Sequence, residues 1–453
     1  MSLRERLSAT QATVNSASIH ELRLAAMPSV RIQVDLKQRV HMALLDRIDL
    51  ARLQKLSQER MVEEIRTQVA AVLDEEDAVL NDFERRALVT EIQNEMLGFG
   101  PLESLLEDTT VSDILVNGHA SVFVERQGRL EKAPVRFDDD DHLMTIIDKI
   151  ASRMGRRVDE SSPMVDARLP DGSRVNAIIP PLALDGPVLS IRKFAKVPLR
   201  MPDLIRNKSV PEPMSRLLDA IVGAKLNALI SGGTGSGKTT LLNILSSFIS
   251  DRERIVTIED AAELQLQQSH VVRLETRPAN MEGRGEVNQR ALVRNALRMR
   301  PDRIILGEVR GSEVIDMLQA MNSGHEGSIA TIHANSPRDA LTRVESMVGL
   351  SEVSIPVKAI RQQIASAISV IIQVSRLNDG KRKIVSVQEI TGLEGDTIAM
   401  HEIWGFRQTG LSADGQVTGY FSATGIRPRF LDRLVNAGYA IPEELFDPSR
   451  RYA

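Results

Sequence analysis

The sequence predicts an α/β protein whose C-terminal half is built on a parallel sheet and whose N-terminal half holds a helical bundle and a small α+β module. Three observations support this prediction. Strand-length apolar runs alternate with helical patterns from about Met214 onward, helical spacing of apolar residues extends from Val34 to Met96, and strand patterns with hairpin turns lie between these regions. A chain of 453 residues is long enough for two or three such domains.

The composition narrows the possible functions. The net charge is −4, so the chain lacks the overall basic character of a nucleic-acid binder, and we expect no nucleic-acid partner. Aromatic residues make up only 3% of the chain, too few for a base-stacking platform. The lack of cysteine excludes disulfides, thiolate metal sites and cysteine nucleophiles. Because the sequence shows neither a signal peptide nor a membrane-length apolar run, we expect a cytoplasmic protein that reaches a membrane only through partners.

The N-terminal region predicts a tail followed by helices. Residues 1–30 show weak periodicity, and we expect a flexible tail there. Residues 31–100 carry three helical stretches joined by short loops, which predicts a helical bundle. The second stretch spans Met61–Leu73 and the third Asp82–Met96. The apolar stripes favour a bundle core over a ligand site, and a docking surface stays open as an alternative.

Residues 101–197 predict an α+β module. Asn117-Gly118 and Asp171-Gly172 are hairpin signals between strand-like runs, and a helix is expected from His142 to Met154. Arg168, Arg174 and Arg192 lie on or beside these strands, where a solvated basic face is the simplest account.

The remaining residues predict a linker and a large domain. Proline-containing residues 198–213 are expected to form the linker, and residues 214–453 the domain with the parallel sheet. The candidate strands are Leu226–Ile230, Ile255–Ile258, His270–Leu274, Arg303–Leu306 and Ser328–Ile332.

A phosphate loop follows the first of these strands. The pattern G-x-x-x-x-G-K-T sits between a buried strand and a helix, which is the Walker A context. Its residues are Gly232, Gly233, Thr234, Gly235, Ser236, Gly237, Lys238, Thr239 and Thr240. We expect Lys238 to reach the β- and γ-phosphates of ATP and the hydroxyl of Thr239 to bind Mg²⁺.

Acidic residues follow two further strands. Gly307-Glu308 ends an apolar strand in the manner of a Walker B motif, but Gly307 occupies the position of the usual aspartate. Glu308 is therefore the candidate that activates the attacking water. Glu259, in the group Glu259-Asp260 with Glu263, is the candidate that holds Mg²⁺ through water.

Histidines and arginines complete the candidate site. His325 and His333 are eight residues apart around a strand, which does not suit a zinc pair, so each is either structural or a sensor of the γ-phosphate. Arginines crowd the same region at positions 294, 298, 300, 303 and 310. We chose Arg298 and Arg310 as candidates for stabilising the transferring phosphoryl group, within a chain or across a subunit boundary.

Taken together, these motifs resemble the secretion-ATPase superfamily that powers type II secretion, type IV pili and type IV secretion. Ile258-Glu259-Asp260 is similar to its Asp box, Leu306–Arg310 to its atypical Walker B motif, and Gly324–Pro337 to its His box. Finer matches resemble one branch, the Tad/Flp pilus assembly ATPases of CpaF type. They are Leu44–Leu50, Asp113–Gly118, Asp166–Arg174 and Ala423–Pro428.

The resemblance implies a RecA-like P-loop NTPase domain preceded by a sensor domain, in a homo-hexameric ring that hydrolyses ATP. It also implies an inner-membrane platform protein as partner, pilin as the indirect cargo, and a position at the inner face of the inner membrane. In this picture Arg168, Arg174 and Arg192 reach the phosphates from the sensor side. Two other functions stay open: a DNA-translocating RecA-like motor, and a nucleotide-gated scaffold that barely turns over.

Overall fold

The chain folds into two compact units. This computed structural model describes residues 57–76, 80–126, 128–194, 198–277, 279, 284–351 and 355–452, with residues 36, 37, 39, 40, 42–44 and 47. The first unit contains the described residues up to Arg126 together with Leu130–Lys193, and the second contains Gln127–Arg129 and Phe194–Ala453. The predicted tail of residues 1–30 lies outside the described residues.

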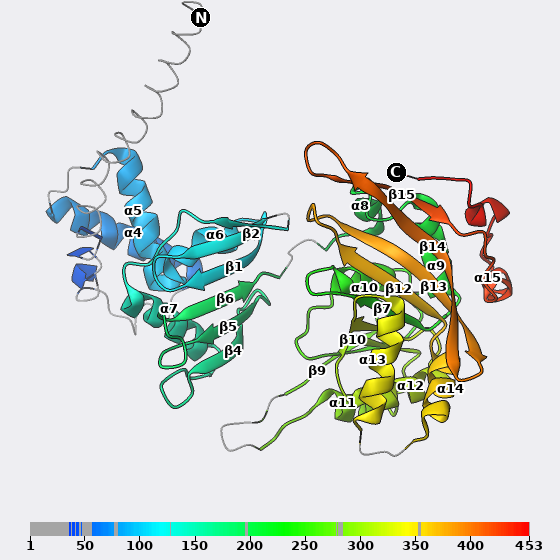
Figure 1. Cartoon of the computed structure of the whole chain (residues 1–453). Coiled ribbons are helices and arrows are strands. Elements are labelled where there is room, and N and C mark those ends of the chain that lie inside the picture. Colours follow the sequence, from blue (N-terminus) through cyan, green and yellow to red (C-terminus); the bar gives the residue numbers. More distant parts are fainter. Residues whose placement is uncertain are drawn as a thin grey trace, which may run out of the picture. The chain divides into compact units, whose positions relative to one another are not determined.

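Helices open the first unit (Figure 1). Helix α4 (Gln58–Glu75) is followed by α5 (Asp82–Leu97), η1 (Gly100–Leu102) and α6 (Glu103–Glu107). Asn81 and Glu84 form a reciprocal capping box that fixes the start of α5. Buried apolar residues of α4 and α5, such as Ile65 and Ile92, pack with Leu36, Val40 and Leu44 into one small core.

A six-stranded sheet completes the first unit, in the order β3-β2-β1-β6-β5-β4. The strands are β1 (Val111–Asn117), β2 (Val122–Arg126), β3 (Arg129–Lys132), β4 (Met164–Arg168), β5 (Arg174–Ile178) and β6 (Val188–Arg192). Helix α7 (Asp140–Arg153) contributes its buried face to the same core as the inward residues of these strands.

The helices and this sheet belong to one unit, although we predicted them as separate domains of residues 31–100 and 101–197. The reason is a set of hydrogen bonds between α7 and the C-terminal end of α5. Lys149 donates to the carbonyls of Glu95 (2.8 Å) and Met96 (3.1 Å), and Arg153 donates to the carbonyl of Leu97. These cations satisfy carbonyls that a helix end leaves without partners.

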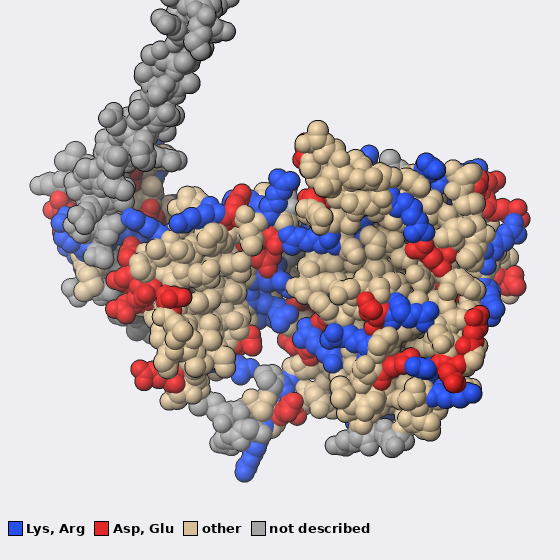
Figure 2. Space-filling model, viewed as in Figure 1, with Lys and Arg blue, Asp and Glu red and all other residues tan. Residues whose placement is uncertain are grey.

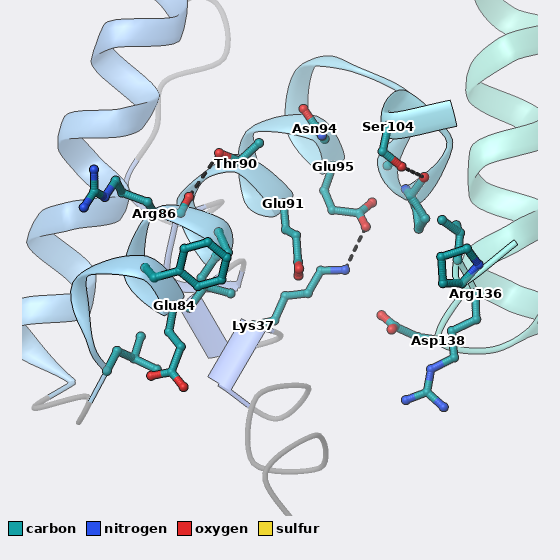
Figure 3. Close-up of a pocket in the computed structure, with 18 residues that line it drawn as sticks. Lys37, Glu84, Arg86, Thr90, Glu91, Asn94, Glu95, Ser104, Arg136 and Asp138 are labelled. Carbon is teal, nitrogen blue, oxygen red and sulfur yellow. Dashed lines mark hydrogen bonds and ion pairs between the residues drawn. The ribbon is translucent and has the colours of Figure 1, made fainter. Parts of the chain in front are cut away.

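A pocket of 940 Å³ opens beside α5 in the first unit (Figure 3). The side chain of Lys37 points into it and pairs with Glu95 at 2.9 Å. Burial alone would raise the pKa of Glu95, but its hydrogen bond with His142 and the charge of Lys37 lower that pKa to about 2. None of the predicted site residues lines this pocket.

The second unit is organised by a nine-stranded sheet in the order β15-β14-β13-β12-β7-β11-β10-β8-β9 (Figure 1). Strands β7 (Ala228–Gly232), β8 (Ile255–Glu259), β9 (Val271–Glu275), β10 (Arg303–Val309), β11 (Ile329–His333) and β12 (Val370–Arg376) form its parallel part. Strands β13 (Arg382–Glu394), β14 (Thr397–Leu411) and β15 (Val417–Ala423) extend it as an antiparallel meander.

Helices cover both faces of this sheet. Ala228 and Ile230 belong to the core under α8 (Met201–Arg206), α9 (Glu212–Gly223), α10 (Lys238–Ser246), α15 (Leu431–Asn436) and η2 (Glu443–Phe446). Leu229, between them, belongs to the core under α11 (Gln289–Ala296), α12 (Glu313–Asn322), α13 (Pro337–Gly349) and α14 (Val357–Ala367). The continuous apolar run of β7 follows from burial on both sides. The predicted α/β fold is confirmed.

Residues 198–213 are not the linker that we predicted. They contain α8 and the start of α9, and Met201 and Val210 are buried in the core under α9 and α10. Pro202 and Pro213 lie in the first turns of α8 and α9, a position that accepts proline, instead of marking an extended segment.

Candidate nucleotide-binding and hydrolysis site

The phosphate loop joins β7 to α10 and depends on its glycines. Gly235 and Gly237 have φ angles of 67° and 95°, which glycine adopts without strain. At Gly232 a Cβ atom would lie 2.5 Å from both the hydroxyl of Ser236 and the carbonyl of Val374. The loop can therefore close over the end of β7 only with glycine at these positions.

The loop is also closed by hydrogen bonds to one carbonyl. Lys238 donates to the carbonyl oxygen of Gly233 at 3.0 Å, and the hydroxyl of Ser236 donates to the same oxygen at 2.8 Å. Thr239 and Thr240 follow in the first turn of α10, where helix N–H groups favour an anion. A phosphate is the anion that this loop and Lys238 fit.

Strands β11 and β10 carry His333 and Glu308 to the same edge of the sheet. His333 is directly opposite Gly232 in the register of β11 with β7. Ile332 faces Val309 of β10, and the hydroxyl of Thr331 donates to the carbonyl of Gly307 at 2.6 Å. Because β10 is two strands from β7, Glu308 lies on the order of 10 Å across the sheet from the loop strand. That span leaves room for a phosphoryl group and a water molecule.

Glu308, Arg310 and Asp260 form one ion-paired cluster. Arg310 Nε donates to Glu308 Oε2 at 2.8 Å, and Arg310 Nη1 is 3.3 Å from Asp260 Oδ2. The backbone N–H groups of Arg310 and Gly311 donate to Glu313, which fixes the turn before α12. Arg310 therefore binds acidic groups of its own chain, beside the carboxylate that we predicted to activate water.

Glu259 is buried next to the Walker B position. Its side chain is only 3% exposed, and burial raises its pKa to about 7. Oε2 accepts the N–H groups of Glu263 (2.7 Å) and Leu264 (2.9 Å), while Oε1 has no hydrogen-bond partner among the described residues. A Cβ atom on Gly307 would lie 3.0 Å from Glu259 Cγ. Glycine stands in place of the usual aspartate because Glu259 fills the space beside it.

The donors at this edge fit a Mg²⁺ ion held mainly by phosphate and water. Within the part of the chain that the structure describes, no three His, Asp or Glu side chains gather into a metal cage. Phosphate-bound Mg²⁺ needs few protein ligands, and the hydroxyl of Thr239 is the one that the loop presents. The unsatisfied Oε1 of Glu259 is an acceptor that a hydrated cation would satisfy. Glu259 lies three strands from β7, so the two residues are not adjacent ligands.

Two predicted site residues lie at the opposite edge of the sheet. His325 precedes the five-residue strand β11, which separates it from His333 by about 16 Å. Its carbonyl accepts the hydroxyl of Ser328, and its Nδ1 is buried. Arg298 is exposed after α11, near the amino end of β10, whereas Glu308 is near the carboxyl end. Neither residue lies at the phosphate edge of its own chain, so a role at that chain's own nucleotide is wrong for both. A role of Arg298 across a subunit boundary stays a prediction.

Two arginines at this edge escaped the sequence analysis. Arg376 ends β12 and Arg382 begins β13, directly opposite each other. Arg382 Nε donates to the carbonyl of Gly235 at 2.9 Å. The sequence near these arginines indicates only a turn between two strands. It gives no sign of the contact with the phosphate loop, because Arg382 and Gly235 are 147 residues apart.

In the first unit, Arg168, Arg174 and Arg192 form a row on three adjacent strands. Arg168 is opposite Arg174, and Arg174 is opposite Arg192, so their side chains share one face of the sheet. The alternate residues Val175 and Ile191 are buried in the core on the other face. Arg192 Nε donates to Asp113 at 3.0 Å. The row therefore gathers positively charged side chains on one face of this sheet.

The fold and the residues at the carboxyl edge of the large sheet define a P-loop ATP hydrolase with a RecA-like domain. The chain belongs to the type II/IV secretion system protein family, whose model matches residues 95–403. In the described residues we find no helix with the length and apolar character to cross a membrane.

Relatives and solved structures are similar to most of the chain. A Mycobacterium tuberculosis protein named for conjugal transfer is 39% identical over 332 residues, which are 72% of this chain and 94% of that protein. The conjugal transfer protein TrbB of Rhizobium radiobacter is 31% identical over 294 residues, 64% of this chain and 86% of that protein. The crystal structure of the VirB11 ATPase from the Brucella suis type IV secretion system is 28% identical, with a TM-score of 0.35, and the match covers 63% of this chain and 94% of that one.

Proposed function

We propose that this chain is the ATP-hydrolysing motor of a Tad/Flp type IV pilus, of CpaF type, and that it works as a homo-hexamer at the inner face of the inner membrane. The observation that carries the hydrolytic part is the meeting of Lys238, Glu308 and His333 at one edge of the large sheet. The finer motif matches, such as Asp166–Arg174, support the pilus branch.

Each residue at the edge has a distinct role in this proposal. The loop N–H groups and Lys238 bind the phosphates, and Glu308 orients the attacking water and accepts its proton. The hydroxyl of Thr239 would help to hold Mg²⁺ on the phosphates, and the ion would supply positive charge that favours attack on phosphorus. Glu259 holds the loop after β8 in place and faces the hydrated ion. His333, next to Gly232, senses the γ-phosphate.

The proposed ring is supported by arginines that lie away from the phosphate loop of their own chain. Arg168, Arg174 and Arg192 would face the nucleotide from the sensor sheet, with Arg310 and Arg298 as candidates for contacts across subunits. Closure of the sensor sheet on nucleotide would then be coupled to movement of a membrane platform partner, which assembles or retracts pilin.

The relatives' names favour a second candidate, a motor for type IV secretion or conjugal transfer. A DNA-translocating motor is a weaker alternative, because the net charge is −4 and the visible face carries acidic as well as basic side chains (Figure 2). A nucleotide-gated scaffold would need no water-activating residue such as Glu308.

Two experiments test these functions. The first is the mass of the purified protein in solution, with and without Mg²⁺ and a non-hydrolysable ATP analogue. We expect a species of about six chains that nucleotide stabilises, and a strict monomer under both conditions contradicts the ring.

The second experiment is deletion of the gene in its host. Loss of surface pili with unchanged conjugal transfer supports the pilus motor, and the reverse pattern supports the second candidate.

A further inference from the structure

The turn between β12 and β13 places two arginines at the rim of the phosphate loop. Val374 of β12 is opposite Gly232 in the parallel register with β7, so the pairing of these two strands ends where the phosphate loop begins. Two residues later, Arg376 ends the strand, and Arg382 returns directly opposite it on β13. Directly opposed residues of an antiparallel pair point to the same face. Both guanidinium groups therefore stand on one side of one turn.

Both side chains approach the loop closely. Arg382 Nε donates to the carbonyl of Gly235 at 2.9 Å. Its Cδ lies 3.3 Å from the position that a Cβ atom would take on Gly237, and Arg376 Nη1 lies 3.6 Å from the corresponding position on Gly235. The two arginines therefore flank the middle of the loop, whereas Lys238 lies at its helical end.

The turn itself is rigid, which fixes this arrangement. Leu377 donates its N–H to Lys381 at 2.7 Å, and Gly380 donates to Leu377 at 2.9 Å. Asp379 accepts the N–H groups of Lys381 and of Val417, the first residue of β15, both at 3.0 Å. A side chain that only filled surface space would not need a turn held at so many points.

The hydrogen bond from Arg382 also orients the loop. In a trans peptide the C=O and the next N–H point in opposite directions. Holding the carbonyl of Gly235 toward Arg382 turns the N–H of Ser236 away from it, and that N–H donates to the carbonyl of Gly233 at 3.4 Å within the loop. Arg382 therefore helps to hold the closed shape of the loop, and a phosphate loop needs that shape to bind its ligand.

We propose that Arg376 and Arg382 form an arginine clamp on the α- and β-phosphates of the bound nucleotide. In this clamp, Arg376 donates to the carbonyl of Gly128 through Nη2 and contacts the phosphates through Nη1, the nitrogen that faces Gly235. Arg382 is a positioning residue that holds the loop through the carbonyl of Gly235. The assignment to α and β follows from the place of the two side chains, because the body of a phosphate loop holds those phosphates and its lysine reaches β and γ. This proposal rests on the proposed nucleotide site, and it adds that the site distinguishes nucleotides with two or more phosphates from a monophosphate.

The test compares nucleotide affinities of full-length variants, measured with fluorescent analogues of ATP, ADP and AMP. Arg376→Gln should weaken ATP and ADP by the same factor, about tenfold for one charge-assisted contact, and should weaken AMP much less. Arg382→Gln should show the same pattern, and Arg382→Lys should restore part of the affinity because it can still donate to Gly235.

Two controls are needed. One tests whether any loss of positive charge from this turn weakens binding, and the other tests whether the phosphate loop binds nucleotide at all. Lys381→Gln removes the same charge from the same turn, where Lys381 is paired with Asp379, and should leave all affinities within about twofold. If Arg376→Gln matches Lys381→Gln, or weakens ATP alone, the clamp is wrong. If Lys238→Ala also binds nucleotide normally, the proposed nucleotide site itself is wrong. Thermal unfolding of each variant identifies any loss that comes from misfolding.

Discussion

Arg310 binds Glu308 through a hydrogen bond of 2.8 Å, although only one residue separates them at the end of β10. The candidate for activating water is thus paired with a candidate for stabilising phosphoryl charge. Proton acceptance by Glu308 would weaken this pair and release Arg310 toward other anions. Chemistry at one carboxylate can in this way change which group its neighbouring guanidinium binds.

We expect Glu308→Gln to reduce the rate of ATP hydrolysis by a factor of about 100 to 10,000, because glutamine cannot accept the proton of the attacking water. ATP affinity should change little. Steady-state phosphate release and nucleotide binding measure the two effects. Glu326→Gln is the matched control, since Glu326 pairs with Arg433 near the amino end of β11. Normal turnover in Glu308→Gln would remove this residue from its role.

Glu259 makes stability depend on pH. Its pKa in the folded protein is about 7, above the ordinary value of 4.5, so the folded chain binds more protons between these values. The stability contribution of this group is complete below pH 4.5 and is lost as the pH rises through 7. Glu259→Gln should therefore gain stability relative to the parent protein between pH 6 and pH 8, as measured by urea unfolding without nucleotide. A difference that does not vary with pH contradicts this assignment.

Arg174 stands between two other arginines, and we expect Arg174→Gln to change the free energy of unfolding of the isolated protein by no more than about 1 kcal/mol, the scale of cross-strand side-chain pairs. The same change should reduce nucleotide-dependent ATPase activity. Chemical unfolding and phosphate release test the two effects together. Lys132→Gln on the exposed strand β3 should alter neither. Unchanged ATPase activity would show that the row does not serve the nucleotide.

Arg303 has a purely structural role at the start of β10. It is fully buried, pairs with Glu253 at 2.8 Å and donates to the carbonyl of Val222 at 2.7 Å. Arg303→Met should cost about 3 to 5 kcal/mol in free energy of unfolding, because Glu253 is left mostly buried without this partner. Adding Glu253→Gln should recover part of that loss. Arg216→Ala, in an exposed helical pair with Glu212, should cost less than about 1 kcal/mol.

Local patterns predicted the fold and the centre of the site. The phosphate loop is one contiguous segment, and strand ends identify Glu308 and His333 because parallel strands end at a common edge. His325 lies at the other edge of the sheet, because the five-residue strand β11 lies between it and the end of that strand at His333. Motif similarity alone had grouped the two.

Contacts between distant segments were not predictable. The approach of Arg382 to Gly235 depends on β12 pairing with β7, and the replacement at Gly307 makes sense only beside Glu259 on the next strand. Residues 198–213 looked like a linker because proline marks both loops and helix starts. Only the burial of Met201 and Val210 distinguishes the two.

The hydrogen bonds from Lys149 and Arg153 to the end of α5 have a mechanical consequence. A hinge between the helical bundle and the sensor sheet would have to break charged contacts that lie along the axis of α5. While these bonds hold, α4 and α5 would move together with α7 and with the sheet that carries Arg168, Arg174 and Arg192. A partner bound to the bundle would therefore act on this sheet through α7.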